Sequence, residues 1–285
     1  MALRPEDVRS LEILSGVLRG EGWTFVVIGA TVPWILATRS TGLRGTRDID
    51  VVVNTTSWDD FERAGSRLRD AGFTRRHLHE FISPHGTRID LLPYGQGLVR
   101  GDTIAWPDGA TMSALGLAEA FDSAVERQIT EALSVHVATE AAFALLKVVA
   151  YMDRPTARSK DLGDLIDTFA RYEEEGDRRF ELFDVSVDSS PLQFEEAGAY
   201  LLGTDVAALA APKTRGVIQK FLAGLTDEYS RPVGQVLTEE KRTGSDERRA
   251  EVWRLFRVFR GGFERRCGPK VYRAVDVQLA RRKRA

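Results

Sequence analysis

The chain has 285 residues, of which 43% are hydrophobic and 29% are charged. This composition is typical of a soluble globular protein with one large domain or two modest ones. The N-terminal stretch is amphipathic and carries acids and arginines, so the sequence predicts neither a signal peptide nor a membrane span. The single Cys267 rules out an internal disulfide and a cysteine-based zinc site. Together these features predict a cytoplasmic protein that does not act on a membrane.

The net charge of −2 is distributed unevenly along the chain. From Lys241 to Ala285 there are 15 Lys and Arg residues against 5 Asp and Glu, a balance of +10, which leaves the preceding 240 residues at −12. An acidic body with a basic C-terminal region predicts an anionic partner for that region. The final run of basic residues, 281–284, is more typical of a solvated tail than of a binding site.

The first elements form a strand-to-helix turn. Apolar residues at helical spacing predict a helix over 8–18, and the nearly continuous apolar run 23–29 predicts a buried strand that ends at Gly29. Residues 30–38 can form a helix with Pro33 in its first turn. A strand that ends at Gly29 and turns into a helix exposes backbone N–H groups at the turn, and these can hold a phosphate.

A basic, glycine-containing turn follows and leads into a second apolar strand that begins with Asp48-Ile49-Asp50. Side chains of a strand alternate between its two faces, so Asp48 and Asp50 share one face. Two carboxylates side by side repel each other unless a cation lies between them, and Mg²⁺ prefers oxygen ligands of this kind. The alternative is a strand end whose acids face water or pair with Arg44 and Arg47.

A third acid lies on a later strand. Residues 57–71 begin with a serine cap and predict a crossover helix, 73–82 should be extended, and 83–86 should form a turn. The strand over 87–93 then carries Asp90 between apolar neighbours. A buried carboxylate needs a partner, and the obvious one is the metal expected at Asp48 and Asp50.

The rest of the chain predicts loops or an edge hairpin over 94–111, one strand over 132–137 and then helices. The expected helices span 139–152, 159–172, 192–209, 213–225 and 247–259. The charged, irregular stretch 173–188 is the best candidate for a domain boundary. The predicted fold class is α/β (α+β), a short mixed sheet flanked by helices. A nucleotide-handling domain would span 1–175, with its sheet core at about 23–137, and a mainly helical C-terminal domain with a basic tail would span 190–285.

A phosphate-binding turn beside three acids on neighbouring strands is what metal-assisted phosphoryl or nucleotidyl transfer requires. At these residues the sequence resembles the nucleotidyltransferase (polymerase β-like) superfamily, with Gly29-Ala30 at its Gly-Gly or Gly-Ser turn, Asp48-Ile49-Asp50 at its Asp-x-Asp and Asp90 as the third carboxylate. Ala30 departs from the family pattern because it lacks the hydroxyl of serine and the freedom of glycine.

Two further stretches are similar to one branch of that superfamily, the AbiEii-like toxin nucleotidyltransferases. Arg44-x-Thr46-x-Asp48-Ile49-Asp50 is similar to the R-x-T/S-x-D-I-D form of this family, and the residues around Lys147 and 158–165 are similar to its helical K…R…K-D-L-x-D-L signature. The resemblance covers roughly 26–169.

The resemblance implies roles for individual residues. Asp48 and Asp50 would hold two Mg²⁺ ions, with Mn²⁺ as a substitute, and Asp90 would bind one ion and help to deprotonate the acceptor hydroxyl. Nucleotide-binding roles are implied for Gly29, Ala30, Arg44, Thr46, Arg47, Lys147 and Lys160. Thr46 alternatively braces the turn, Lys147 alternatively extends its side chain to the surface, and Asp161 alternatively pairs with an arginine.

The expected function is transfer of a nucleoside monophosphate from an NTP to an acceptor hydroxyl. The family resemblance implies a toxin of a toxin–antitoxin system, with RNA (tRNA above all) or protein as acceptor and a cognate antitoxin as partner. One alternative is an antibiotic-modifying nucleotidyltransferase, which would need an acidic acceptor pocket. Another is a nucleotide- or RNA-binding module of the same fold without turnover.

Two further patterns invite other interpretations. His77, His79 and His85 lie close in sequence, but without nearby thiols a zinc site is the weaker hypothesis. Phenylalanines recur at helical spacing among arginines over 254–263, a pattern typical of a packed helix with a basic face. The same pattern would also suit RNA, through phosphate contacts and aromatic stacking.

Overall fold

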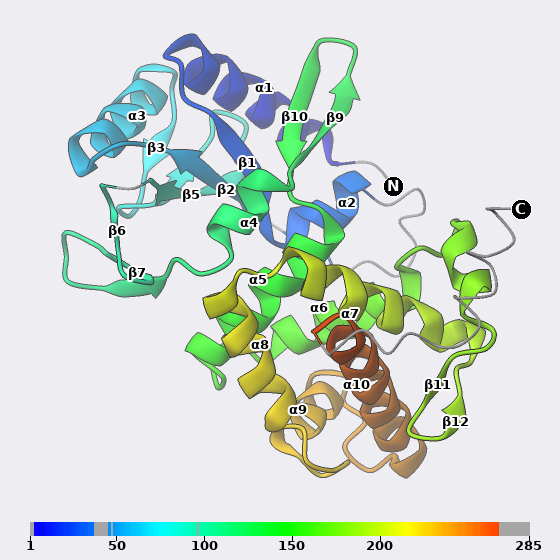
Figure 1. Cartoon of the computed structure of the whole chain (residues 1–285). Coiled ribbons are helices and arrows are strands. Elements are labelled where there is room, and N and C mark those ends of the chain that lie inside the picture. Colours follow the sequence, from blue (N-terminus) through cyan, green and yellow to red (C-terminus); the bar gives the residue numbers. More distant parts are fainter. Residues whose placement is uncertain (1–2, 37–44, 47, 96, 268–285) are drawn as a thin grey trace, which may run out of the picture.

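The structure is a computed structural model that describes residues 3–36, 45–46, 48–95 and 97–267 (Figure 1). It is a mixed α/β fold in which a seven-stranded sheet is flanked by helices and followed by a helical region. The helices are α1 (Pro5–Gly20), η1 (Gly29–Thr31), α2 (Val32–Leu36), α3 (Trp58–Asp70), α4 (Leu117–Asp122), α5 (Glu140–Asp153), α6 (Lys160–Arg171), η2 (Asp177–Leu182), η3 (Phe194–Glu196), α7 (Ala197–Leu209), α8 (Pro212–Ala223), α9 (Arg231–Glu239) and α10 (Asp246–Cys267).

The strands form three sheets. They are β1 (Phe25–Ile28), β2 (Asp48–Asn54), β3 (Thr74–Arg75), β4 (Glu80–Ile82), β5 (Arg88–Tyr94), β6 (Val99–Arg100), β7 (Thr103–Ala105), β8 (Thr111–Ser113), β9 (Val125–Thr130), β10 (Leu133–Val137), β11 (Ser186–Val187) and β12 (Ser190–Pro191). The large sheet has the order β3-β4-β5-β2-β1-β10-β9, β6 to β8 form a small second sheet, and β11 pairs with β12. Within the large sheet β2 and β5 are parallel, as are β1 and β10, whereas the other neighbours are antiparallel. The predicted mixed sheet is confirmed.

Helices cover both faces of the large sheet. Figure 1 shows α1 and α3 on one side and α5 on the other. The crossover helix α3 forms as its sequence predicts, because the hydroxyl of Ser57 accepts a hydrogen bond from Asp60 N at the first turn. Thr139 caps α5 in the same way by accepting from Ala142 N.

Two hydrophobic cores meet in α5. The first fills the sheet and its covering helices and includes Phe143 from the start of α5, whereas the second joins Val148 and its neighbours to α6 and to the helices from α7 onward. The division between the two cores therefore lies within α5. The face of β2 and β5 that carries the acids is turned toward this junction.

The sequence did not predict strand β9, helices α4 and α9, the short helix η2 or the strand pair β11–β12. Strand β9 (VERQIT) is an edge strand whose side chains are mostly exposed, so it has little apolar alternation to reveal it. Helices α4 and α9 span only 6 and 9 residues, too short for a sustained helical period. In the described part of the chain, no helix is both long and apolar enough to cross a membrane.

The aromatic residues of α10 belong to the second core. Phe256, Phe259 and Phe263 are each 0% exposed, which confirms the packed-helix interpretation. Stacking of RNA bases on these rings is therefore ruled out. The arginines of α10 make contacts inside the fold: Arg248 with Glu240, Arg254 with Glu196, Arg257 with Asp188, and Arg260 with the carbonyl of Leu222.

Candidate active site

The candidate site is centred on the turn from β1 into η1. Gly29 has a φ of +69°, a left-handed conformation that favours glycine. A Cβ atom at Gly29 would lie 1.8 Å from Asp50 Oδ2, so the carboxylate of Asp50 occupies the space directly above the turn. Any residue with a side chain at position 29 would displace Asp50. The turn and the acid thus form one unit, although they are 21 residues apart in the chain.

Strand register brings the other acids to the same place. Because β2 and β5 are parallel, Asp48 pairs with Arg88 and Asp50 pairs with Asp90. Glu80 of β4 pairs with Asp90 from the other side. Paired residues point to the same face of a sheet, so four acids and one arginine crowd one face. The sequence predicted Asp48, Asp50 and Asp90 together, and the structure brings them together.

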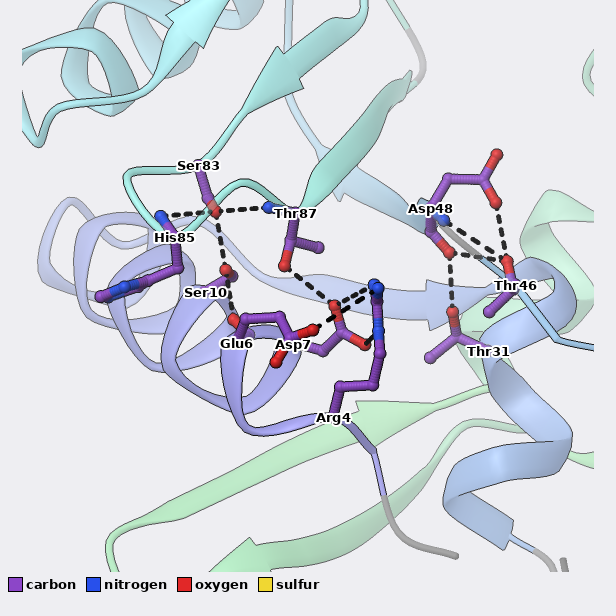
Figure 2. Close-up of polar contacts among 10 residues, drawn as sticks. All are labelled: Arg4, Glu6, Asp7, Ser10, Thr31, Thr46, Asp48, Ser83, His85 and Thr87. Atoms are coloured by element: carbon purple, nitrogen blue, oxygen red, sulfur yellow. Dashed lines mark hydrogen bonds and ion pairs between the residues drawn. The ribbon is translucent and has the colours of Figure 1, made fainter.

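Two threonines brace Asp48 (Figure 2). Thr46 donates its hydroxyl hydrogen bond to Asp48 Oδ1 at 2.7 Å and to the Asp48 carbonyl at 3.0 Å, while Thr31 donates to the same carbonyl at 3.1 Å. These contacts bear out the bracing alternative for Thr46. Because the Thr31 hydroxyl is used on Asp48, it does not replace the hydroxyl that Ala30 lacks.

Helix α1 fixes the turn that leads into β5 (Figure 2). The hydroxyls of Ser10 and Ser83 lie 2.7 Å apart, and Thr87 donates to Asp7 Oδ1 at 2.9 Å. Arg4 donates to both carboxylate oxygens of Asp7 at 2.8 Å. Since Ser10, Ser83 and Thr87 are buried, these bonds resist competition from water. They set the start of β5, and hence the position of its acid.

Arg88 lies between two of the acids. Its Nη2 is 2.8 Å from Asp48 Oδ2 and 3.3 Å from Asp90 Oδ2, and its Nε is 3.7 Å from Glu80 Oε2. Neither Arg88 nor Glu80 was predicted from the sequence as a site residue. Strand alternation could have indicated Arg88, because it precedes Asp90 by two residues and therefore lies on the same face of its strand. The same alternation placed Asp48 and Asp50 on one face. Glu80 lies on another strand, and only the register shows it.

The three carboxyl groups differ in acidity. Burial acts to raise the pKa of Asp48, but the hydrogen bond from Thr46 and the charges of Arg88 and Lys160 outweigh it and lower that pKa. Burial and the neighbouring charges of Asp48 and Asp90 raise the pKa of Asp50 to about 7. The pKa of Asp90 is also raised, mainly by burial, which Arg88 offsets only in part. A shared site with pKa values pushed apart is typical of acid–base chemistry.

Lys147 does not extend to the surface. Its side chain is 11% exposed, and its Nζ lies 2.8 Å from Asp161 Oδ1 and 2.6 Å from Asp164 Oδ2. Because the apolar residues of α6 lie on one face, its sequence predicts Asp161 and Asp164 at the surface, and this prediction is wrong: they are 1% and 7% exposed. The helical pattern could not show this, since it marks the apolar face of α6 but not the partner on α5. The Asp161 carboxylate pairs closely with Lys147 and also forms a long ion pair with Arg158, whose Nη1 lies 4.0 Å from its Oδ2, so the arginine alternative holds beside the lysine contact.

Positive charges from α5, from α6 and from the loop between them nevertheless act on the carboxylates of Asp48 and Asp50. Lys147 and Arg158 act to lower the pKa of Asp50, and the exposed Lys160 acts on Asp48. The structure thus brings Lys147 and Lys160 toward the site as the sequence expected. Arg44 and Arg47, for which triphosphate contacts are expected, lie outside the described residues.

A pocket of about 150 Å³ opens beside Asp50 and Gly29. One wall is the sheet, and the others are α5, α4, the end of β8 and the start of α6. Its lining combines apolar residues with three acids (Asp50, Asp153, Asp161) and three cations (Lys147, Arg154, Arg158). The pocket is therefore shared by Asp50 and by three residues of the predicted helical signature, Lys147, Arg158 and Asp161.

The donor set suits a hard divalent cation, which takes carboxylate oxygens. Among the described residues Asp90 Oδ1 is buried without a hydrogen-bond partner, and burial together with the charges of Asp48 and Asp90 raises the pKa of Asp50. In the described part of the chain, however, no group of three or more His, Cys, Asp or Glu residues is set to enclose a metal. The reason is visible at Asp48, which points to Arg88 and Thr46. An ion shared by all three acids would take the place of the Arg88 contact.

The three neighbouring histidines have other surroundings. His79 packs against Trp106 with ring centroids 5.3 Å apart, and His85 forms the turn in which its backbone N–H donates to Ser83. His77 is exposed.

No protein-family model matches the chain, and no curated protein matches its sequence.

Proposed function

We propose that this chain is a nucleotidyltransferase that transfers a nucleoside monophosphate from an NTP to an acceptor hydroxyl. The observation that carries the proposal is the contact between the Gly29 turn and the Asp50 carboxylate, with Asp90 next to Asp50 in register. A turn that can hold phosphate through its backbone N–H groups lies directly against carboxylates that can hold a cation.

Asp48, Asp50 and Asp90 would hold the divalent cations, two Mg²⁺ ions by analogy with the superfamily. Bound there, the ions neutralise the charge of the triphosphate and of the departing pyrophosphate. Lys160 is exposed beside Asp48 and adds positive charge for the triphosphate.

The reaction is a displacement at the α-phosphorus of the NTP. The acceptor oxygen forms a new bond to that phosphorus while the bond to the bridging oxygen breaks, and pyrophosphate leaves with the electron pair. The hydroxyl proton passes to the Asp90 carboxylate, whose Oδ1 is the buried acceptor without a partner among the described residues. The raised pKa of Asp90 suits a general base.

The test offers several acceptors at once. The protein is incubated with each α-labelled NTP, Mg²⁺, tRNA, total RNA and a protein extract, and the labelled product is separated by class. We expect label on RNA or protein, and a toxin would be silenced by a cognate antitoxin. Asp50→Asn and Asp90→Asn should abolish labelling while circular dichroism stays unchanged, with the exposed Asp184→Asn as control. Labelling retained by both site variants would contradict the proposal.

A second candidate is a nucleotide-binding module without turnover. The bridge from Arg88 to Asp48 and Asp90 favours it, because a protein cation already neutralises the acids. It predicts NTP binding without labelling in the same assay. An antibiotic-modifying enzyme has less support, since the pocket beside Asp50 balances three acids against three cations instead of being acidic.

A further inference from the structure

The pocket beside Asp50 has an unsatisfied hydrogen-bond acceptor in its wall. Asp161 lines this pocket and its side chain is 1% exposed. Its Oδ1 accepts from Lys147 at 2.8 Å, but its Oδ2 has no hydrogen-bond partner among the described residues. Arg158 Nη1 forms a long ion pair with Oδ2 at 4.0 Å, beyond hydrogen-bonding distance. A buried acceptor left unpaired is costly, so a donor from a ligand is the natural partner.

The rest of the pocket defines what carries that donor. Its apolar lining includes Leu92, Met112, Leu115, Leu117, Phe143 and Leu146. Apolar walls favour a flat, weakly polar ring over a triphosphate, and the Asp161 carboxylate would repel phosphate oxygens. A cavity of about 150 Å³ has room for a flat ring of nucleobase size beside Asp50. Asp50 fixes which part of a nucleotide this ring is, because the α-phosphate belongs beside that acid.

We propose that this pocket holds the nucleobase of the donor NTP and that Asp161 Oδ2 accepts a hydrogen bond from an exocyclic amino group of the base. This inference rests on the proposed function for the identity of the ligand. Asp161 thereby selects amino-bearing bases, because a base without the donor leaves Oδ2 unpaired inside an apolar pocket. Lys147 holds the carboxylate in place through Oδ1.

The test compares matched nucleotides. Binding of non-hydrolysable ATP, GTP and CTP analogues in the presence of Mg²⁺ is measured by calorimetry against counterparts that lack the exocyclic amino group, such as inosine triphosphate for GTP. For at least one pair the wild type should prefer the amino-bearing member by about tenfold or more, the effect of one hydrogen bond to a charged acceptor. Equal affinity within every pair, or no NTP binding at all, overturns the inference.

Asp161→Asn and Asp164→Asn form a matched pair of variants. Both remove a carboxylate that contacts Lys147, but only Asp161 lines the pocket beside Asp50. Asp161→Asn should lose the preference within the pair, whereas Asp164→Asn should keep it; urea unfolding checks that both are folded. A preference that survives in Asp161→Asn overturns the inference.

A third variant tests whether the base lies in this pocket, independently of its hydrogen bond to Asp161. Met112→Trp enlarges a partly exposed side chain of the pocket wall and should weaken all NTP analogues together. Unchanged affinity in this variant contradicts a base in this pocket. A separate result would contradict the proposed function alone. If the wild type prefers amino-bearing nucleotides but never labels an acceptor, the base pocket is supported and nucleotidyl transfer is not.

Discussion

Asp50 and Gly29 exclude any side chain between them, since a Cβ on Gly29 would lie 1.8 Å from Asp50 Oδ2. The contact couples a backbone turn to a carboxylate of the neighbouring strand. It explains why position 29 requires glycine for two independent reasons, the φ of +69° and the lack of space. Substitutions at Gly29 and at a second glycine with positive φ can separate the two effects.

Gly29→Ala should abolish transfer and destabilise the fold. The positive φ alone costs about 1 kcal/mol, and the displacement of Asp50 adds to it. Gly86→Ala is the matched control, because Gly86 has a φ of +83° but nothing within 4 Å of its Cβ position. We expect Gly86→Ala to lose about 1 kcal/mol in urea unfolding and to keep its activity. Equal effects of the two substitutions would show that the contact with Asp50 does not matter.

Asp50 should make the protein less stable as the pH rises. Its folded pKa of about 7 lies above the ordinary value of 3.8, so between these values the folded state holds a proton that the unfolded state has released. Stability therefore falls from about pH 4 to about pH 7, by about 4 kcal/mol at most.

Asp50→Asn removes this dependence. The variant should be more stable than the wild type at pH 8, and the difference should shrink toward pH 4. Urea unfolding at a series of pH values measures it, and added Mg²⁺ should stabilise the wild type at pH 8 but not the variant. If the difference in unfolding free energy between Asp50→Asn and the wild type did not change with pH, the raised pKa of Asp50 would be contradicted.

Lys147 should be essential for stability. Lys147→Met leaves Asp161 and Asp164 buried without their cation, which costs about 3–5 kcal/mol. The control is Lys213→Met, since Lys213 contacts Asp102 at 2.6 Å but both side chains are exposed, and such pairs contribute about 0–1 kcal/mol. Denaturant unfolding compares them. If Lys147→Met weakened NTP binding without any loss of stability, Lys147 would serve the ligand and not the fold.

Arg88 should set the acid limb of the pH–rate profile. Its charge acts to lower the pKa of both Asp48 and Asp90. Arg88→Gln should therefore raise both pKa values, and the rise of kcat/KM with pH should move to higher pH. The exposed Arg100→Gln is the control and should leave the profile in place. An unchanged acid limb in Arg88→Gln would mean that neither acid limits the reaction.

Local sequence patterns predicted most of the fold because each element carries its own signal. The strand alternation of Asp48-Ile49-Asp50 and the cap at Ser57 depend only on near neighbours, and the structure confirms them. Edge strand β9 gave no such signal, because an exposed strand need not alternate. The same local logic placed Asp48 and Asp50 on one face.

The sequence by itself determined most of the elements, the mixed sheet with its helical continuation, and the three acids on neighbouring strands. Only the tertiary structure decided that Asp50 lies against Gly29, that Arg88 lies between Asp48 and Asp90, and that Lys147 is buried between two acids. The physical reason is range: periodicity and capping arise within a few residues, whereas register and burial arise from contacts between segments far apart in the chain.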